Sequence, residues 1–230
     1  MVTHSLLAKQ SKCAFGVSRV EYLGYFISAE GVSTYPRKIE AVQQWPTPTT
    51  LKQLRGFLGL TGYYRKFIRG YGLIRRPLTE LLKKDGFWWT DKAAEAFAEL
   101  KSALTSAPVL ALPNYALSFI VETDASGTGI GVVLMQTGHP IAFISKGLAP
   151  RHMALSVYEK ELLTLVFVIT KWSHYLLGQH FIVKTDQKAH NYLLDQKLHT
   201  DLQIRWLAKL LPFDFEIQYN KGKENVLMIP

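Results

Sequence analysis

Two predicted strands and the turn between them lie in the stretch Leu117-Ser-Phe-Ile-Val-Glu-Thr-Asp-Ala-Ser-Gly-Thr-Gly-Ile-Gly-Val-Val-Leu-Met135. An apolar, β-branched run reaches Asp124, breaks at small and polar residues, and resumes at Ile130. This pattern is typical of two strands joined by a tight turn. Asp124 therefore lies where a buried strand reaches the surface. It is either a residue that opens the turn or a carboxylate that does chemistry there.

The residues after this stretch predict the rest of a mixed sheet. A third strand is expected at 139–145, a long helix at 152–178 ending at Gly178, and a fourth strand at 180–186. Helices at 189–194 and 201–211 and a fifth strand at 213–219 follow. Three consecutive short strands form an antiparallel meander, and a strand that returns across a helix runs parallel to the first. We therefore expect the fourth strand to lie parallel to the first.

The residues before this stretch predict a hairpin and a small helical module. Residues 17–27 alternate as a strand would, and Gly31 ends the turn that follows. Helices are expected at 38–45, from a cap at Thr49 or Thr50 to residue 69, at 73–84 and at 92–104. The extended segment 107–113 contains two prolines and is the expected domain boundary.

Composition narrows the classes of function. The chain has 230 residues, 48% of them apolar, and a net charge of +9, which favours a polyanionic partner. The longest apolar runs, such as residues 165–169, fall far below the roughly 18 residues that a membrane helix needs. No leader pattern opens the chain, and Cys13 is the only cysteine. We expect an intracellular protein, in a cytoplasmic particle or the nucleus.

The positive charge is concentrated in the helical module. Between residues 41 and 79 there is no Asp or Glu, whereas seven cations occur there: Lys52, Arg55, Arg65, Lys66, Arg69, Arg75 and Arg76. Aromatic residues such as Tyr64 lie among them. One interpretation is a face that follows a nucleic-acid backbone and packs against sugars or bases. The other is a solvated cationic face over a core that contains Phe57, Tyr64 and Phe67.

Carboxylates at two strand ends predict a metal site. If the first and fourth strands are parallel neighbours, Asp124 and Asp186 emerge at the same edge of the sheet. The long helix supplies Glu159 and Glu161, which differ by about 200° around the helix axis, so only one can face the site. Periodicity does not choose between them. Carboxylate oxygens suit magnesium or manganese, and two such ions activate water for phosphodiester cleavage.

Several motifs resemble those of one family. The segment Asp124-Ala-Ser, the helix Tyr158-Glu-Lys-Glu-Leu-Leu163, Thr185-Asp186 and Tyr219-Asn-Lys-Gly-Lys-Glu-Asn225 resemble the ribonuclease H domain of Ty3/gypsy-type LTR retrotransposon reverse transcriptases. Upstream, Val20-Glu-Tyr-Leu-Gly-Tyr25 resembles the primer-grip end of the polymerase palm. The segments Trp45-Pro-Thr-Pro and Leu54-Arg-Gly-Phe-Leu-Gly-Leu-Thr-Gly-Tyr-Tyr-Arg-Lys-Phe-Ile68 resemble the thumb. The resemblance covers nearly the whole chain.

The resemblance implies a fold, an activity and a set of residues. The fold is a ribonuclease H-like, mixed five-stranded α/β (α+β) sheet with flanking helices, after a hairpin and a thumb. The implied domains are 1–35 (end of the palm), 36–107 (thumb) and 108–230 (ribonuclease H). Asp124, Glu161 and Asp186 would bind two Mg²⁺ ions, or Mn²⁺, to cut the RNA strand of an RNA–DNA hybrid. Glu122 and Glu159 would be surface or supporting carboxylates. Nucleic-acid contacts would come from Lys52, Arg55, Tyr64, Arg65, Lys66 and Arg69, and from a primer-grip-like Tyr22, Leu23, Gly24 and Tyr25.

Three features depart from the family pattern. Gln187 follows the second Asp where the family has His or Asn, and Ile229 stands at the position of a fourth acidic ligand. No polymerase carboxylate set precedes residue 20. We therefore expect a ribonuclease H truncated at its C-terminus that functions with the remainder of a reverse transcriptase polyprotein. The alternative is a catalytically weak or inactive remnant that only binds nucleic acid.

Overall fold

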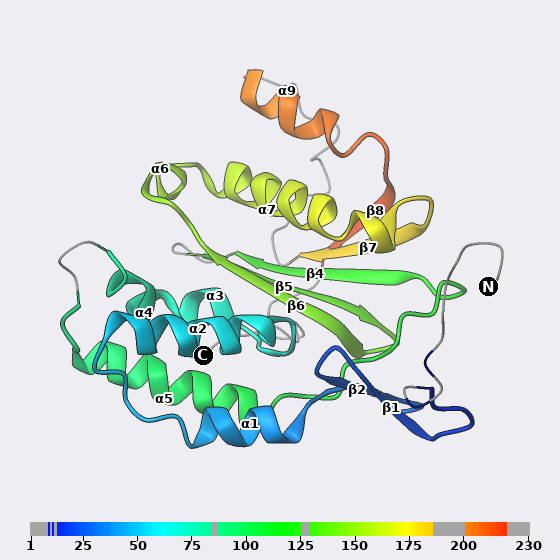
Figure 1. The fold of residues 1–230 in the computed structure, drawn as a ribbon. Coiled ribbons are helices and arrows are strands. Elements are labelled where there is room, and N and C mark those ends of the chain that lie inside the picture. Colours follow the sequence, from blue (N-terminus) through cyan, green and yellow to red (C-terminus); the bar gives the residue numbers. More distant parts are fainter. Residues whose placement is uncertain are drawn as a thin grey trace.

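The computed structural model describes residues 9, 11, 13–83, 87–125, 129–185 and 201–219. A three-stranded antiparallel sheet comes first, a group of helices follows, and a five-stranded mixed sheet with its own helices completes the described part (Figure 1). The expected mixed α/β class and five-stranded sheet are confirmed. The predicted helix at 189–194, Asp186 and residues 220–230 lie outside the described residues.

The segment 17–27, predicted as one strand, contains a tight turn, so the N-terminal sheet has three strands. Its strands are β1 (Arg19–Tyr22), β2 (Tyr25–Ser28) and β3 (Gly31–Thr34). Leu23 and Gly24 have φ values of 48° and 72°, as a two-residue type I′ hairpin turn requires. Val32 in β3 exchanges backbone hydrogen bonds with Leu110, so the sheet is tied to the segment after the helices.

The helical module, which we define as residues 36–107, forms around one apolar core. Its helices are α1 (Pro36–Gln43), α2 (Leu51–Tyr63), η3 (Arg65–Phe67), α3 (Tyr71–Ile74), α4 (Arg76–Glu80) and α5 (Asp91–Thr105). The Thr50 hydroxyl accepts a hydrogen bond from the Gln53 amide at 3.3 Å, which confirms the expected cap of α2. Phe57, Phe67 and Leu100 are buried together.

Two helices of this module are shorter than the sequence pattern predicts. The helix expected to reach residue 69 ends at Tyr63 and continues as the short η3. The helix expected at 73–84 is replaced by α3 and α4. Pro77 lies in the first turn of α4, where its missing amide hydrogen is tolerated, and so it separates the two helices. Apolar spacing alone does not reveal such breaks.

The mixed sheet has the strand order β6-β5-β4-β7-β8. Its strands are β4 (Phe119–Ala125), β5 (Gly129–Gln136), β6 (His139–Gly147), β7 (His180–Thr185) and β8 (Asp214–Tyr219). The first three form the expected antiparallel meander, and β7 pairs in parallel with β4, as predicted. β8 is parallel to β7. Parallel strands bring their carboxyl ends to the same edge.

The predicted long helix over the sheet is divided. It consists of α6 (Pro150–Met153), α7 (Val157–Lys171) and α8 (Ser173–Leu176), and α9 (Asp201–Ala208) lies beyond it (Figure 1). Ser156 starts α7 with a capping box. Leu162, Leu165 and Ile169 of α7 share the main core with the sheet. Figure 1 shows α7 along one face of the sheet and the helical module on the other side of it.

Candidate active site and nucleic-acid interface

The edge of the sheet where Asp124 lies is built by a parallel strand pair. The register between β4 and β7 runs from Phe119 opposite Phe181 to Glu122 opposite Lys184. Asp124 follows near the end of β4 and pairs with Gly131 on the other side. The backbone of Asp124 is therefore at the carboxyl edge, as expected. Its side chain and Asp186 are outside the described part of the structure.

The two glutamates of α7, between which periodicity did not choose, have different environments. Glu159 forms the capping box, because its carboxylate accepts hydrogen bonds from the Ser156 amide at 3.0 Å and the Ser156 hydroxyl at 2.9 Å. Glu161 is 1% exposed and lies on the side of α7 that packs toward the sheet. Glu159 thus stabilises the start of α7, and Glu161 is the glutamate that lies in the interior.

Glu122 is a further buried carboxylate, only 2% exposed, on β4. Of the two roles expected for it, surface or supporting, its burial excludes the surface role. Burying a carboxylate is costly unless hydrogen bonds or a cation compensate. Glu122 and Glu161 are therefore two acidic groups in the interior formed by the mixed sheet and α7, and the same sheet carries Asp124.

The predicted nucleic-acid-binding residues divide into exposed and buried groups. Lys52 and Arg55 on α2 and Arg65 on η3 are exposed, whereas Lys66 and Arg69 are half-buried. Tyr64 is 1% exposed, and its hydroxyl donates a hydrogen bond to the Gly24 carbonyl at 2.9 Å. The expectation that Tyr64 contacts nucleic acid is wrong for this structure, because its ring fills the core. Phe57 and Phe67 are internal as well, which the second interpretation of this stretch anticipated.

The primer-grip-like segment is held against the helical module by aromatic contacts. The Tyr25 ring stacks on Tyr63 with a centroid distance of 5.1 Å, and the Tyr63 hydroxyl donates to the Leu23 carbonyl. The Lys66 ammonium lies 4.2 Å from the centre of the Tyr25 ring. Burial lowers the pKa of Lys66 and raises that of Tyr25. The hairpin tip at Tyr22 and Leu23 stays exposed.

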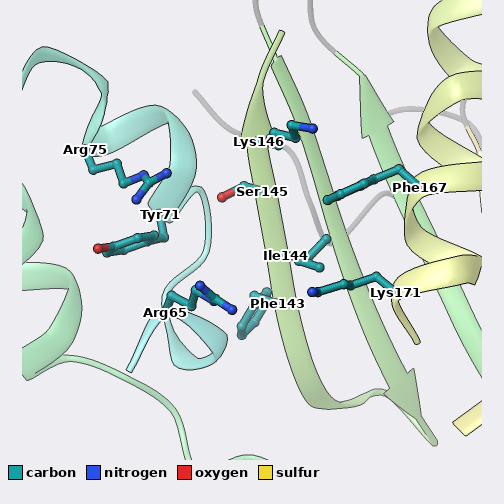
Figure 2. Close-up of a pocket in the computed structure, with 9 residues that line it drawn as sticks. All are labelled: Arg65, Tyr71, Arg75, Phe143, Ile144, Ser145, Lys146, Phe167 and Lys171. Atoms are coloured by element: carbon teal, nitrogen blue, oxygen red, sulfur yellow. The ribbon is translucent and has the colours of Figure 1, made fainter. Parts of the chain in front are cut away.

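A cavity that the sequence did not indicate lies between the helical module and the edge strand β6. Its volume is about 270 Å³, and its lining includes Arg65 and Arg75 from the module, Lys146 from β6 and Lys171 from α7 (Figure 2). Lys146 and Lys171 were not singled out in the sequence because they are isolated cations far from the basic stretch. Only the folded arrangement brings them near Arg65 and Arg75.

Comparison with known proteins identifies the family. Residues 89–183 match the family described as the RNase H-like domain found in reverse transcriptase. The chain is 40% identical over 223 residues to the retrovirus-related Pol polyprotein from transposon 297 of Drosophila melanogaster. It is 56% identical over 121 residues to an uncharacterized mitochondrial protein of Arabidopsis thaliana, 77% of whose length it covers. The chain belongs to the Ty3/gypsy-type retrotransposon Pol family.

The match to the Pol family concerns one region of a longer protein. The match covers 96% of this chain but only 21% of the transposon 297 polyprotein. The structure of a foamy viral protease–reverse transcriptase in complex with double-stranded DNA superposes with a TM-score of 0.79 at 25% sequence identity. That match covers 89% of this chain and 38% of the viral chain. The chain thus spans about a fifth of the polyprotein and carries its ribonuclease H-like domain.

Among the described residues, no group of three His, Cys, Asp or Glu side chains converges on a metal position. These residues include neither Asp186 nor the side chain of Asp124. Within the described ranges, no helix has both the length and the apolar character needed to cross a membrane.

Proposed function

We propose that this Pol-family chain is a ribonuclease H that hydrolyses the RNA strand of RNA–DNA hybrids. The observation that carries the proposal is the combination of three elements. β4 brings Asp124 to the carboxyl edge, β7 runs parallel beside it toward Asp186, and α7 packs on β4 with Glu161 buried. The membership of the chain in a reverse transcriptase family with a ribonuclease H-like domain supports the same activity.

The residues fit a divalent metal cofactor. Asp124, Glu161 and Asp186 offer only carboxylate oxygens, which are the ligands preferred by Mg²⁺ and tolerated by Mn²⁺. Glu161 lies buried on α7, beside the sheet whose carboxyl edge carries Asp124. Two bound ions would supply an activated water and stabilise the charge on the leaving oxygen.

The chain's own groups would position the scissile phosphate. Hydrolysis forms a bond from a water oxygen to phosphorus, breaks the bond from phosphorus to a ribose oxygen, and transfers a proton to that oxygen. The parallel pair β4–β7 fixes the carboxyl edge at which β4 reaches Asp124 and β7 ends at Thr185, and the capping box fixes where α7 begins. A carboxylate set on strands and a helix is held more tightly than one on loops.

The proposed nucleic-acid partner contacts the helical module and the hairpin. The foamy viral relative has been solved with double-stranded DNA, and this chain presents the exposed cations Lys52, Arg55 and Arg65 on the corresponding module. Lys66 and Arg69 belong to the same module and are half-buried, and Tyr22 and Leu23 form the exposed hairpin tip. We assign residues 1–35 to the end of the palm, 36–107 to the thumb and 108–230 to the ribonuclease H domain, which would act with the rest of a reverse transcriptase polyprotein.

The proposal is tested by cleavage of an end-labelled RNA–DNA hybrid with and without Mg²⁺. The parent chain is expected to shorten the RNA strand only with metal, and Asp124→Asn is expected to lose this activity while keeping the melting temperature of the parent. Hybrid that is bound but never cut by the parent would instead support the second function, nucleic-acid binding without catalysis. Cutting by Asp124→Asn at the parental rate would put the active site elsewhere.

A further inference from the structure

We propose that the cavity between the helical module and β6 is the first part of a groove that binds the phosphodiester backbone and leads it to the catalytic edge. This inference rests on the proposed function and adds a site to it. The residues that would bind phosphates are Arg65, Arg75, Arg76, Lys146 and Lys171.

The charge of the cavity is the first argument. Its nine lining residues include four cations, namely Arg65, Arg75, Lys146 and Lys171, and no Asp or Glu. Figure 2 shows Arg65 and Arg75 on the side of the helical module, Lys171 extending from α7, and Lys146 on the β6 strand between them. Several like charges around one hollow repel each other, and an anion between them relieves the repulsion.

The shape of the hollow is the second argument. The cavity shares Arg75, Ser145, Lys146 and Phe167 with a neighbouring groove of about 700 Å³. The groove adds Arg76, Lys83, Glu80 and His152, and its single acidic residue, Glu80, is paired with Lys83. The two adjoining hollows are both lined by cations, which suits a chain of phosphates better than one isolated anion.

The direction of the groove is the third argument. Ile130 and Gly147 line its second part. Ile130 pairs with Ala125, the residue next to Asp124, and Gly147 pairs with Gly129 at the same end of β5. The groove therefore opens at the carboxyl edge of β4, where the candidate active site lies. A backbone bound by Lys146 and Lys171 would be directed toward that edge.

The groove exists only because the helical module is docked on β6. The Gly72 amide donates a hydrogen bond to the Ser145 hydroxyl at 2.6 Å, and a Cβ added at Gly72 would lie 2.4 Å from the Ser145 carbonyl oxygen. A Cβ added at Gly129 would lie 2.2 Å from the Leu73 side chain. The cations of the helical module and those of β6 and α7 can contact one ligand only when the module is docked on β6. Binding of a nucleic-acid backbone would therefore stabilise the docked arrangement.

The test compares the salt dependence of hybrid binding by the full chain, measured by fluorescence anisotropy without divalent metal so that no cleavage occurs. The double variant Lys146→Gln/Lys171→Gln is expected to lower the slope of log affinity against log salt by about one to two units. The matched control Lys92→Gln/Lys209→Gln removes the same charge from exposed positions outside both hollows and is expected to keep the parental slope. Lys146→Arg/Lys171→Arg keeps the charge and should keep the slope.

The outcomes separate this inference from the proposed function. An unchanged slope in Lys146→Gln/Lys171→Gln, with a parental melting temperature, would overturn the groove even if the parent cuts hybrids. An equal loss in the control double variant would also overturn it, because the effect would then be one of total charge. A lowered slope in a chain that never cuts would support the groove and contradict the ribonuclease activity.

Discussion

At the start of α7, two glutamates that are two residues apart in the chain have separate tasks. Glu159 completes a hydrogen-bonded cap with Ser156, and Glu161 is buried toward the sheet. Removing the cap hydroxyl leaves amides of the first turn without an acceptor. We predict that Ser156→Ala lowers the free energy of unfolding by about 1 kcal/mol, as loss of such caps does.

Urea denaturation measures this change. Ser156→Thr is the matched control, because a threonine hydroxyl can also cap a helix, and it should recover most of the stability. A Ser156→Ala chain as stable as the parent would mean that the capping box contributes nothing to α7.

The half-buried Lys66 predicts a pH dependence of stability. Burial lowers its folded pKa from the ordinary 10.5, so the charged form is disfavoured in the folded state. Well below the lowered pKa the side chain is charged in both the folded and the unfolded state, so folding carries the full free-energy cost of burying the charge. As the pH rises through the lowered pKa toward 10.5, the folded state releases the proton and the cost disappears. The parent should therefore gain stability relative to Lys66→Met over this interval.

Thermal melts of the parent and Lys66→Met at a series of pH values between neutral and 10 would reveal this difference. Titration of the neighbouring tyrosines affects both chains, so the difference between their melting temperatures isolates Lys66. A gap that stays constant with pH, or that moves against the parent, would show that contact with the Tyr25 ring, rather than burial, governs the charge.

Among the elements, the short helix α3 forms the joint between the helical module and the large sheet. Gly72 lies so close to the β6 backbone that a methyl group cannot be added without displacement. We predict that Gly72→Ala costs about 1–3 kcal/mol, as overpacking does, and weakens hybrid binding by opening the groove. Gly59→Ala in α2 is the matched control, since its Cβ would meet nothing within 4 Å, and it should stabilise the chain by up to about 1 kcal/mol through helix propensity.

Differential scanning calorimetry distinguishes the two glycine variants. Gly72→Ala should melt below the parent and Gly59→Ala at or above it. If Gly72→Ala had the melting temperature and the hybrid affinity of the parent, the contact between α3 and β6 would accommodate a methyl group despite the short distance to Ser145.

The elements that the sequence predicted well are those whose pattern is local. Alternating or continuous apolar runs identified the strands of the large sheet, and the return across a helix identified β7 as parallel to β4. The breaks at Ser156 and before α4 were missed, because apolar spacing continues across them while the caps and Pro77 end the helices. The turn at Leu23 and Gly24 was also missed, because residues 17–27 alternate as a single strand would, whereas they form the hairpin β1–β2.

At the scale of the whole molecule, the sequence predicted the strands that carry the candidate site but not the side chains that surround it. The end of β4 and the parallel return follow from the order of elements, so Asp124 was placed at the right edge. The choice of Glu161 over Glu159 needed the resemblance to the family, and the cap contacts of Glu159 now give a physical reason for it. Tyr64 was misplaced because an aromatic residue between cations looks the same whether its ring is buried or exposed.

The basic groove depends on contacts between distant parts of the chain and had no signal in the sequence. Arg75 belongs to the cationic stretch, but Lys146 and Lys171 come from β6 and the end of α7. Their convergence follows from docking of α3 on an edge strand. In the proposed arrangement, the sheet edge at Asp124 would hold the metal ions. The basic groove between the helical module and β6 would lead the nucleic-acid backbone to that edge.

The central claim is tested most directly by the single-turnover rate of Mg²⁺-dependent cleavage of an RNA–DNA hybrid by Glu161→Gln compared with Glu159→Gln. Glutamine still serves in a capping box, so Glu159→Gln should cut at close to the parental rate. Glu161→Gln keeps the shape of the buried side chain but removes the charge that would hold a metal ion, and its rate should fall at least about 100-fold, or roughly 2.7 kcal/mol in the barrier. Equal rates for the two variants, or a larger loss in Glu159→Gln, would contradict the assignment of Glu161 to the active site.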